Sequence, residues 1–446
     1  MSEPELNVDI PNEADWPIQS VDSLCSLISR GTAPVYVEYS EVLAIGQRCV
    51  ASTGFAPNFA RPHSHRAMRN VLRPESGDVL LNSTGTGTIG RSVVFNAPGT
   101  FIVDGHVTVM RPRADLADSR WLNSVLRMPA LQRHLERFCF AGSTNQLELN
   151  RTPLRVSRLP TPHIDDQRAM GLVIDALDTA IYETEAIIAK LKAVKQGLQH
   201  DLLTRGITAN GEQRPAQAEA PHLYKESPLG WIPKEWDVVT LESLSKTVTS
   251  GSRDWARFYA DSGALFVRIG NLTREHINFR YESTIYVRPP RNADGQRTRL
   301  ESGDILISIT ADLGIVGVVP DGLGEAYINQ HIALVRPDLD VVNSRFIGHY
   351  LAGPIAQTYI SKLNDAGAKA GINLPTIRGL VTAKPLRAEQ DLIATRLDEI
   401  DNRLQNATSE SAKLRELKAG LMDDLLTGRV RVTPLLAEAA QQKGSA

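Results

Sequence analysis

The sequence predicts an α+β protein in which two tandem, loop-rich α/β domains are each followed by a long helix. Two observations support this fold class. Motifs of the first half return in the second half about 225 residues later, and each copy ends in a long stretch with apolar residues spaced alternately four and three apart. A chain of 446 residues is also too long for one ordinary hydrophobic core, so its length favours several domains.

The repeat covers most of the chain. Four motifs of the first copy return in the second in the same order: Glu75-Ser-Gly-Asp-Val-Leu80 as Glu301-Ser-Gly-Asp-Ile-Leu306, Asp104-Gly-His106 as Asn329-Gln-His331, Ser119-Arg-Trp-Leu122 as Ser344-Arg-Phe-Ile347, and Leu202-Leu-Thr-Arg-Gly-Ile207 as Leu425-Leu-Thr-Gly-Arg-Val430. The offset changes by only three residues along the chain, which indicates small loop differences between two complete copies of one unit.

Each copy predicts the same succession of elements. Short apolar runs broken by Gly, Pro and Asn are typical of strands, and they fall at Val35–Val42, Val79–Leu81, Ala264–Ile269 and Ile305–Ile309. A helical pattern follows at Ser119–Phe138 and at Ser344–Leu363. Another extended segment closes each domain near Pro160 and Pro385.

The two long helices carry matching heptad seams. The first seam runs Met170, Ile174, Leu177, Ile181, Thr184, Ile188, Leu191, Lys195, Leu198, Leu202, and the second runs Ile393, Leu397, Ile400, Leu404, Ala407, Ser411, Leu414, Lys418, Leu421, Leu425. Both place a lysine at the same step, and acidic residues near the start of each helix suit its dipole. Because an isolated helix of this kind is weakly stable, we expect the two to pair as an antiparallel coiled coil with one domain at each end. The alternative is that each helix packs on its own domain or on another chain.

These patterns predict six regions. The first domain covers 1–160, its helix 161–207, a polar linker 208–225, the second domain 226–385, its helix 386–432, and a flexible tail 433–446.

Composition excludes several classes of protein. Lys+Arg 49 against Asp+Glu 51 gives a net charge of −2, so any anionic partner must meet local basic patches. Cys25, Cys49 and Cys139 lack metal-binding spacing. No apolar run is long enough to span a membrane, and the acidic start is unlike a signal peptide. We therefore expect a reduced, cytoplasmic protein without structural zinc.

Divergent loops are the candidate nucleic-acid contacts. The stretch from Arg61 to Arg73 contains no acidic residue and predicts phosphate contacts, and amide and hydroxyl side chains could contact bases. The candidates are Arg61, His63, His65, Arg66, Arg69, Arg73, Ser143, Thr144, Asn145 and Gln146 in the first copy, and Arg253, Arg257, Lys369 and Asn373 in the second. A solvated loop and ordinary turn capping remain the alternatives. His106 and His331 repeat, and we interpret them as hydrogen-bonded packing residues.

No motif predicts catalysis. Gly85-Thr-Gly-Thr-Ile-Gly90 fits a dinucleotide fingerprint formally, but an extended segment follows it where the fingerprint requires a helix. The sequence contains neither a P-loop nor an amino-methyltransferase motif. We expect the glycines to form turns and the chain to hold neither a catalytic site nor a cofactor.

Together these residues resemble a known family. Leu229-Gly-Trp-Ile-Pro-Lys-Glu-Trp-Asp-Val-Val239, the Ser-Gly-Asp-Ile-Leu run from Ser302, the Asn-Gln-His run from Asn329 and the Leu-Leu-Thr-Gly-Arg run from Leu425 are similar to specificity subunits of type I restriction-modification systems. The first copy departs from this pattern, since Trp16-Pro17 is only a remnant of the Gly-Trp-Ile-Pro opening and Asp104-Gly-His106 replaces Asn-Gln-His.

The resemblance implies two target recognition domains that read a bipartite, gapped site on double-stranded DNA, with the paired helices setting the gap. It also implies that catalysis lies in partners: two modification subunits that use S-adenosylmethionine to methylate adenine N6, and restriction subunits that use ATP and Mg. Two alternatives are a specificity fragment of a fused restriction enzyme or methyltransferase, and a coiled-coil scaffold unrelated to DNA.

Overall fold

The computed structural model describes residues 6–143, 146–289, 293–310, 312–365 and 372–432. The chain forms two compact units. The first contains Met1–Thr184 and Ser411–Ala446, and the second contains Glu185–Glu410. Each unit therefore combines one globular domain with half of each long helix. The tail predicted at 433–446 lies outside the described residues.

The first domain is built on an antiparallel sheet of order β3-β11-β8-β9, formed by β3 (Cys25–Arg30), β11 (Val107–Pro112), β8 (Val79–Asn82) and β9 (Ser92–Val94). A second sheet joins β10 (Thr100–Val103), β4 (Val42–Ile45) and β7 (Arg61–Pro62), with β4 and β10 parallel. The smaller strands are β1 (Leu6–Asn7), β2 (Ile18–Ser20), β5 (Val50–Ala51), β6 (Gly54–Phe55), β12 (Phe140–Ala141), β13 (Glu148–Leu149) and β14 (Ser157–Pro160).

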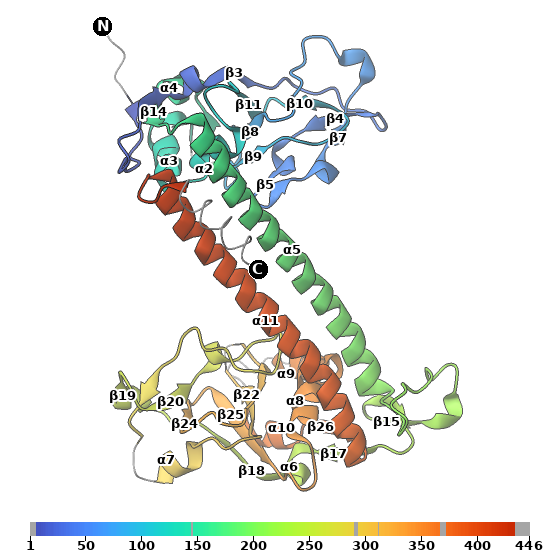
Figure 1. Cartoon of the computed structure of the whole chain (residues 1–446). Helices are drawn as coiled ribbons and strands as arrows, with labels where there is room; N and C mark the ends of the chain where they lie inside the picture. The colour runs from blue at the N-terminus through green and yellow to red at the C-terminus, as the bar shows by residue number, and fades with distance from the viewer. Residues whose placement is uncertain (1–5, 144–145, 290–292, 311, 366–371, 433–446) are drawn as a thin grey trace, which may run out of the picture. The chain divides into compact units, whose positions relative to one another are not determined.

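Helices cover one face of this first sheet. They are α1 (Val21–Leu24), α2 (Ser119–Leu126), α3 (Pro129–His134) and α4 (Arg151–Val156), and α2 packs against β8, β9 and β11 (Figure 1). The core between helices and sheet contains Trp121 and Leu122 with Val79 and Leu81. This core continues into the first turns of the long helix α5 (Ile164–Thr204) through Met170.

The second domain repeats this topology. Its main sheet has the order β18-β25-β22-β23, formed by β18 (Ser245–Ser250), β25 (Ile332–Pro337), β22 (Ile305–Ser308) and β23 (Val316–Val318). The remaining strands are β15 (Tyr224–Ser227), β16 (Gly230–Pro233), β17 (Asp237–Thr240), β19 (Tyr259–Ala260), β20 (Ala264–Val267), β21 (Tyr286–Val287), β24 (Ala326–Ile328) and β26 (Val381–Lys384). As in the first domain, one further pair, β20 and β24, is parallel.

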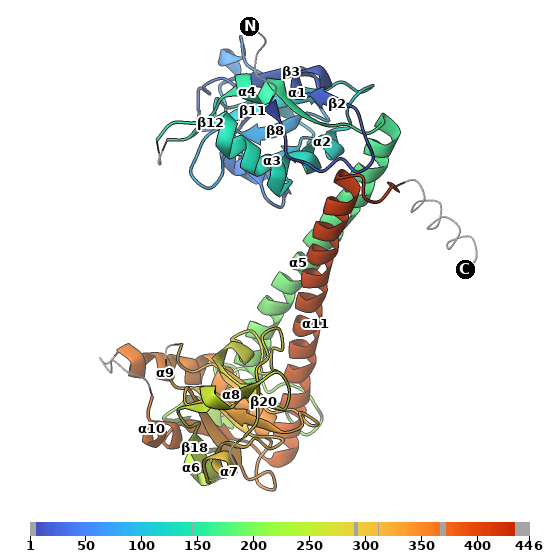
Figure 2. The ribbon, with the colours of Figure 1, turned by 90° about the vertical axis from the view of Figure 1, so that its left-hand side faces the viewer.

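The helices of the second unit are α6 (Leu241–Leu244), α7 (Ala293–Thr298), α8 (Ser344–Ala352), α9 (Pro354–Asp365), α10 (Leu374–Arg378) and the long α11 (Arg387–Leu426). Both α6 and α7 lie beside β18 (Figure 2). The helices α8, α9 and α10 stand where α2, α3 and α4 stand in the first unit, so the sequence repeat is a repeat of the fold.

The structure shows the role of the repeated Glu-Ser-Gly-Asp motif. The buried carboxylate of Asp78 accepts the backbone N–H of Glu75 at 2.7 Å and pairs with the Arg111 guanidinium at 2.8 and 2.9 Å. Asp304 does the same in the second domain. The glycine before each Asp has a φ near +85°, at +90° and +82°, a conformation that other residues rarely adopt. The motif is therefore a structural turn tied to β11 or β25.

Two predictions of secondary structure were wrong. In Val35–Val42 only Tyr36 pairs, in a single bridge with His63, and β4 begins at Val42. The N–H of Val35 instead donates to the His63 ring, so this segment does not form a ladder. The single helices predicted at 119–138 and 344–363 are each two helices, because Pro129 and Pro354 disfavour a helical conformation at the residue before them.

The glycines of the 85–90 motif are turn formers, as predicted. Gly85, Gly87 and Gly90 have positive φ, and the strand β9 follows them. The amide of Gln132 donates to the carbonyl of Gly90, and Gln357 holds the matching loop of the second domain through Gly314.

Within each unit the long helices run antiparallel (Figure 1). In the first unit, Met170 and Ile174 share a core with Leu425 and Leu426, while Lys418 pairs with Asp178 further along α5. Residue numbers that increase along α5 are thus paired with residue numbers that decrease along α11, as in any antiparallel pair.

The second unit follows the same rule. Leu202 packs with Ile393, while Lys195 pairs with Asp401 at 2.5 Å. The predicted seam residues are buried or half-buried throughout both helices: Ile174, Leu177, Ile181, Ile188, Leu191, Leu198, Leu397, Ile400, Leu404, Leu414 and Leu421.

Candidate nucleic-acid interface

One turn recurs in both domains and carries an imidazole. We call it the Thr–His turn and define it as 104–106 with Thr84 in the first domain, and 329–331 with Thr310 in the second. The His106 N–H donates to the Asp104 carboxylate at 3.0 Å, and the His106 Nδ1 lies 2.9 Å from the Thr84 hydroxyl. The same two contacts in the second domain measure 3.2 Å and 2.5 Å. Each ring is thereby fixed by its own backbone and by one hydroxyl.

A glycine supports each Thr–His turn. A Cβ on Gly31 would lie 2.2 Å from the carbonyl oxygen of Val103, and one on Gly251 would lie 1.9 Å from that of Asn329. Single bridges, Thr32 to Asp104 and its counterpart in the second domain, continue the contact. Close approach of two backbones is possible only without a side chain, so the turn is rigidly seated.

The basic stretch 61–73 lies against the first Thr–His turn. Tyr36 forms the link, since its backbone bridges to His63 and its hydroxyl donates to Asp104 at 2.9 Å. The Arg61 guanidinium stacks over the Tyr36 ring at 3.7 Å. Burial, and then the hydrogen bond to Asp104, raise the pKa of Tyr36, so its proton stays on the hydroxyl and keeps the link intact.

Glu148, just after the predicted stretch 143–146, reaches the same turn. Glu148 forms a single bridge with Thr84 and an ion pair with Arg30 at 3.2 Å. Hydrogen bonding to Arg30 lowers the pKa of Glu148. Arg30 in turn donates from Nε to the carbonyl of Gly105. The two stretches that the sequence predicted separately therefore meet one rigid turn, the first through Tyr36 and the second through Glu148.

The second domain converges likewise. Ser252 forms a single bridge with Asn329, and its loop continues to Trp255, which is buried and stacks on Phe266 with ring centroids 5.1 Å apart. On the far side, the N–H of Ile372 donates to the carbonyl of Ile309, next to Thr310. Ser252 and Ile372 therefore both lie beside the second Thr–His turn.

Most predicted contact residues are exposed, namely Arg61, His65, Arg66, Arg69, Arg73, Ser143, Gln146, Arg253 and Arg257. Thr144, Asn145 and Lys369 lie outside the described residues. The positive side chains can approach phosphates, and the turn between them presents hydrogen-bonding groups.

The structure corrects the prediction for His63 and the repeat match predicted for Asn373. His63 is buried, with 1% of its surface exposed; its Nδ1 accepts the N–H of Val35 at 3.0 Å and its Nε2 lies 3.2 Å from the carbonyl of Ala67. Both nitrogens are thus occupied within the protein. Asn373 caps α10 by accepting the N–H of Thr376 at 2.9 Å, and its counterpart is Asn150, the cap of α4, rather than the 143–146 loop.

His106 is hydrogen-bonded as the sequence predicted, but it is not a packing residue. Its side chain is 58% exposed, whereas His331 is half-buried. No local pattern indicates this exposure, because an exposed polar turn and a buried one can contain the same residues.

The structure also adds a basic segment that the sequence analysis missed. The strand β21 takes the place of β7, so the counterpart of 61–73 is the segment 286–299, where Arg288, Arg297 and Arg299 are exposed. Arg297 donates to Thr249 at 2.7 Å and to Ser252 at 2.5 Å, which ties the segment to the loop before Trp255. Applying the repeat offset to 61–73 would have found it.

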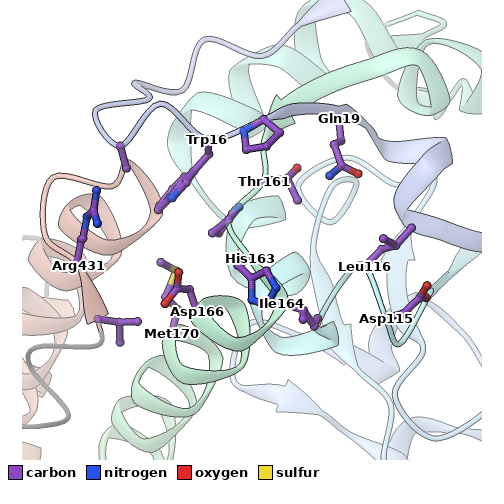
Figure 3. A pocket seen from close by; sticks show the side chains of 14 residues that line it. Trp16, Gln19, Asp115, Leu116, Thr161, His163, Ile164, Asp166, Met170 and Arg431 are labelled. Carbon is purple, nitrogen blue, oxygen red and sulfur yellow. The ribbon is translucent and has the colours of Figure 1, made fainter.

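A cavity of about 980 Å³ in the first unit lies where the N-terminal segment meets the start of α5 and the residues after α11. Figure 3 shows Trp16 and Arg431 at one side and Leu116 and Asp115 at the other. In the second unit the matching corner is occupied by Arg214, which pairs with the buried carboxylate of Glu389. The cavity thus belongs to the framework around the helices.

Neither a metal cluster nor a membrane span is found in the part of the chain that the structure describes. It holds no group of three or more His, Cys, Asp or Glu placed to bind a metal ion, and none of its helices is long and apolar enough to cross a membrane. The three cysteines are free and buried.

Comparison with known proteins supports the resemblance to type I restriction-modification specificity subunits. Residues 233–418 match the family model described as type I restriction modification DNA specificity domain. The chain is 24% identical over 364 residues to a putative type I restriction enzyme MjaX specificity subunit of Methanocaldococcus jannaschii, covering 80% of this chain and 79% of that protein. It is 23% identical over 287 residues to the MjaVIII specificity subunit of the same organism, covering 62% of this chain and 63% of that protein.

A solved structure shares the fold. The type I restriction-modification S subunit from M. genitalium superimposes with a TM-score of 0.62 at 13% identity, covering 95% of this chain and 98% of that one. This likeness shows that the chain shares the two-domain α+β fold of that S subunit. Over most of its length the chain is similar to type I restriction-modification specificity subunits, and residues 233–418 match the model of their DNA specificity domain.

Proposed function

We propose that this chain reads DNA for a type I restriction-modification complex, with each domain contacting one half of a bipartite, gapped target. The main support is the Thr–His turn, which recurs in both domains with different exposed loops around it. A repeated rigid centre with divergent surroundings is what two readers of different half-sites require. A coiled-coil scaffold without a DNA target would need neither a repeated rigid turn nor divergent loops around it.

The two kinds of side chain around each turn have different tasks. The exposed arginines of 61–73 and of 286–299 neutralise phosphates, which fixes the position of the domain without selecting a sequence. Selection comes from side chains around the turn that reach base edges. The net charge of −2 confines this attraction to the loops.

The lengths of α5 and α11 set the gap between the half-sites in this proposal. Both helices are continuous, with 41 and 40 residues. Inserting one heptad after Ile188 and one after Ser411 adds about 10 Å of helix. We expect the recognised gap to lengthen by about three base pairs, since B-DNA rises 3.4 Å per base pair. An unchanged gap would refute this role.

The reaction lies in partner subunits. Two modification subunits bring S-adenosylmethionine for transfer to adenine N6, and restriction subunits bring ATP and Mg. This chain supplies the choice of sequence and a platform for assembly. We expect the purified chain to consume neither S-adenosylmethionine nor ATP.

Methylation mapping tests the proposal. The chain is reconstituted with the modification subunit of its own system, and methylated adenines are sequenced in a random DNA library. We expect two sequence elements separated by a fixed gap. Replacing 61–73 by a neutral Gly-Ser loop should weaken or change only one element, and loss of both to the same degree would contradict independent readers.

A further inference from the structure

A loop of the first domain that the basic stretch does not include has an apolar surface. The segment 33–41, which we call the 33–41 loop, follows directly after the residue that bridges to Asp104 of the Thr–His turn. Its large exposed apolar side chains are Val35, Tyr36, Val37 and Tyr39, and Tyr39 is 84% exposed. Single exposed apolar side chains are ordinary, but four within five residues form a patch of the kind that marks a contact surface.

The backbone of the 33–41 loop is held by the protein although its side chains are exposed. The N–H of Val35 donates to the His63 ring at 3.0 Å, and the carbonyl of Val35 accepts the N–H of Ser64 at 2.8 Å. The N–H of Val37 donates to the carbonyl of Pro62 at 3.2 Å. The fold therefore determines where the exposed side chains lie.

These contacts place the loop beside the basic stretch 61–73. The Arg61 guanidinium also stacks over the Tyr36 ring at 3.7 Å. Because the arginines of that stretch attract phosphates, a bound duplex comes close to the 33–41 loop. The loop thus adjoins the DNA contacts of the proposed function.

The loop itself is not a phosphate contact. Its charged residues are Glu38 and Glu41, both exposed, and it contains no Lys, Arg or His. Carboxylates repel phosphates, so what the loop offers a duplex is apolar surface for base edges. Thymine is the base that presents an apolar group in the major groove, its C5-methyl.

The matching segment of the second domain, 253–263, has a different surface. It lies between β18 and β20, as the 33–41 loop lies between β3 and β4, and it follows Ser252, which bridges to the second Thr–His turn. Its Trp255 is buried, however, and Arg253 and Arg257 are exposed instead. Equivalent positions therefore present apolar groups in one domain and guanidinium groups in the other, as readers of different half-sites require.

From this placement we propose that the 33–41 loop reads the first half-site and that Tyr39 is its specificity-determining residue, in contact with the C5-methyl group of a thymine. The inference rests on the proposed function and names the segment that selects the sequence in one domain. Tyr36 is a positioning residue, because Asp104 accepts its hydroxyl hydrogen and Arg61 covers its ring. Tyr39 is the most exposed apolar side chain of the loop.

The test uses the chain assembled with the modification subunit of its own system. Methylation mapping gives the bipartite site, and the variant with 61–73 replaced identifies the half-site of the first domain. Each thymine of that half-site, except the partner of the methylated adenine, is then replaced by uracil, which lacks only the methyl group. We expect one replacement to lower the methylation rate at subsaturating DNA about fourfold or more, the effect of removing one methyl group from an apolar contact.

Tyr39→Ala should make the complex indifferent to that uracil and should relax the same base position in methylation mapping. Tyr39→Phe keeps the ring and should retain the thymine preference. The matched control is Tyr182→Ala, because Tyr182 is an exposed tyrosine of the same unit on α5, outside the loop. It should leave the uracil effect and both half-sites as in the parent chain. Thermal unfolding close to that of the parent chain excludes misfolding of each variant.

The outcomes separate the inference from the proposed function. If the complex methylates a bipartite site but no uracil replacement lowers the rate, or if Tyr39→Ala maps like Tyr182→Ala, the assignment of Tyr39 is wrong while the function stands. A first half-site without a further thymine, or loss of the preference in Tyr39→Phe, would also overturn the methyl contact. If Tyr39→Ala weakens assembly with the modification subunit and leaves the map unchanged, the loop is a protein contact instead. If the parent complex shows no bipartite site, the proposed function itself fails.

Discussion

Lysines at the same step of the two heptad seams should differ sharply in what they contribute to stability. Lys195 and Lys418 correspond in the repeat, and each pairs with an aspartate of the other long helix within its own unit, Asp401 and Asp178. We expect Lys195→Met to be far more destabilising than Lys418→Met. The reason lies in the surroundings of the two carboxylates.

The Asp401 side chain is fully buried. It receives the Lys195 ammonium at 2.5 Å and the N–H of Ile277 at 3.0 Å. Removing the ammonium leaves a buried carboxylate with one backbone donor and with the His349 Nδ1 3.9 Å away, which costs about 3–5 kcal/mol. Asp178 is 35% exposed and keeps Arg127 at 3.1 Å when Lys418 is removed. A partly hydrated ion pair of this kind contributes about 1 kcal/mol or less. The two substitutions should thus differ by at least about 2 kcal/mol.

Native-state hydrogen exchange in low urea measures the difference, because it reports opening free energies for peptides of each unit separately. Lys195→Met should lower protection in α8 and in the start of α11, and Lys418→Met should leave the first unit nearly unchanged. The double variant Lys195→Met with Asp401→Leu removes both charges and should recover much of the loss. Equal costs for the two lysines, or no recovery, would refute the reasoning.

Three further outcomes follow from local geometry. All three thiols are buried, and burial raises the pKa of Cys25 to about 12. The folded chain should therefore resist an aromatic disulfide reagent at pH 8 and react fully in urea. The stability that the buried, protonated Cys25 thiol contributes is present below the unfolded thiol pKa and is lost as pH rises toward the folded pKa. Gly251→Ala should cost about 1–3 kcal/mol in urea unfolding because its Cβ would lie 1.9 Å from a backbone oxygen, while Gly270→Ala, with open space around it, should cost less than 1 kcal/mol. Burial opposes ionisation of Asp398, but hydrogen bonds from His349 and a neighbouring arginine lower its pKa; its stabilisation is present above the unfolded pKa and lost as pH falls through the folded one, so His349→Gln should move the acid-unfolding midpoint to higher pH.

The fold class could be predicted because its signals are periodic. A heptad seam spans many turns, so a single misplaced residue does not hide it, and α5 and α11 begin and end within a few residues of the predicted bounds. A motif that returns at a fixed offset is similarly insensitive to local error. Boundaries that depend on one residue, such as Pro129 and Pro354, were missed because the apolar pattern continues across them.

The candidate interface could be predicted only in part. Charged side chains are usually exposed, so the exposure of the arginines in 61–73 could be predicted from the composition of that stretch. Burial of His63 depends on a contact with Val35, nearly thirty residues away, which no local pattern encodes. The meeting of 61–73 with Glu148 at one turn depends on the sheet topology in the same way.

The lysines in the seams are better explained by register than by stability. An ammonium in an apolar seam is costly, and burial lowers the pKa of Lys418 even though Asp178 opposes this change. Yet each lysine meets an aspartate at the same repeat position of the other helix, Asp401 or Asp178. A parallel pairing in register would set the two ammonium groups against each other, and a shift by one heptad would place Lys195 opposite Ala394 or Thr408 instead of Asp401. The cost therefore falls most heavily on the wrong alignments, which is how a buried polar residue selects one orientation and register of paired helices.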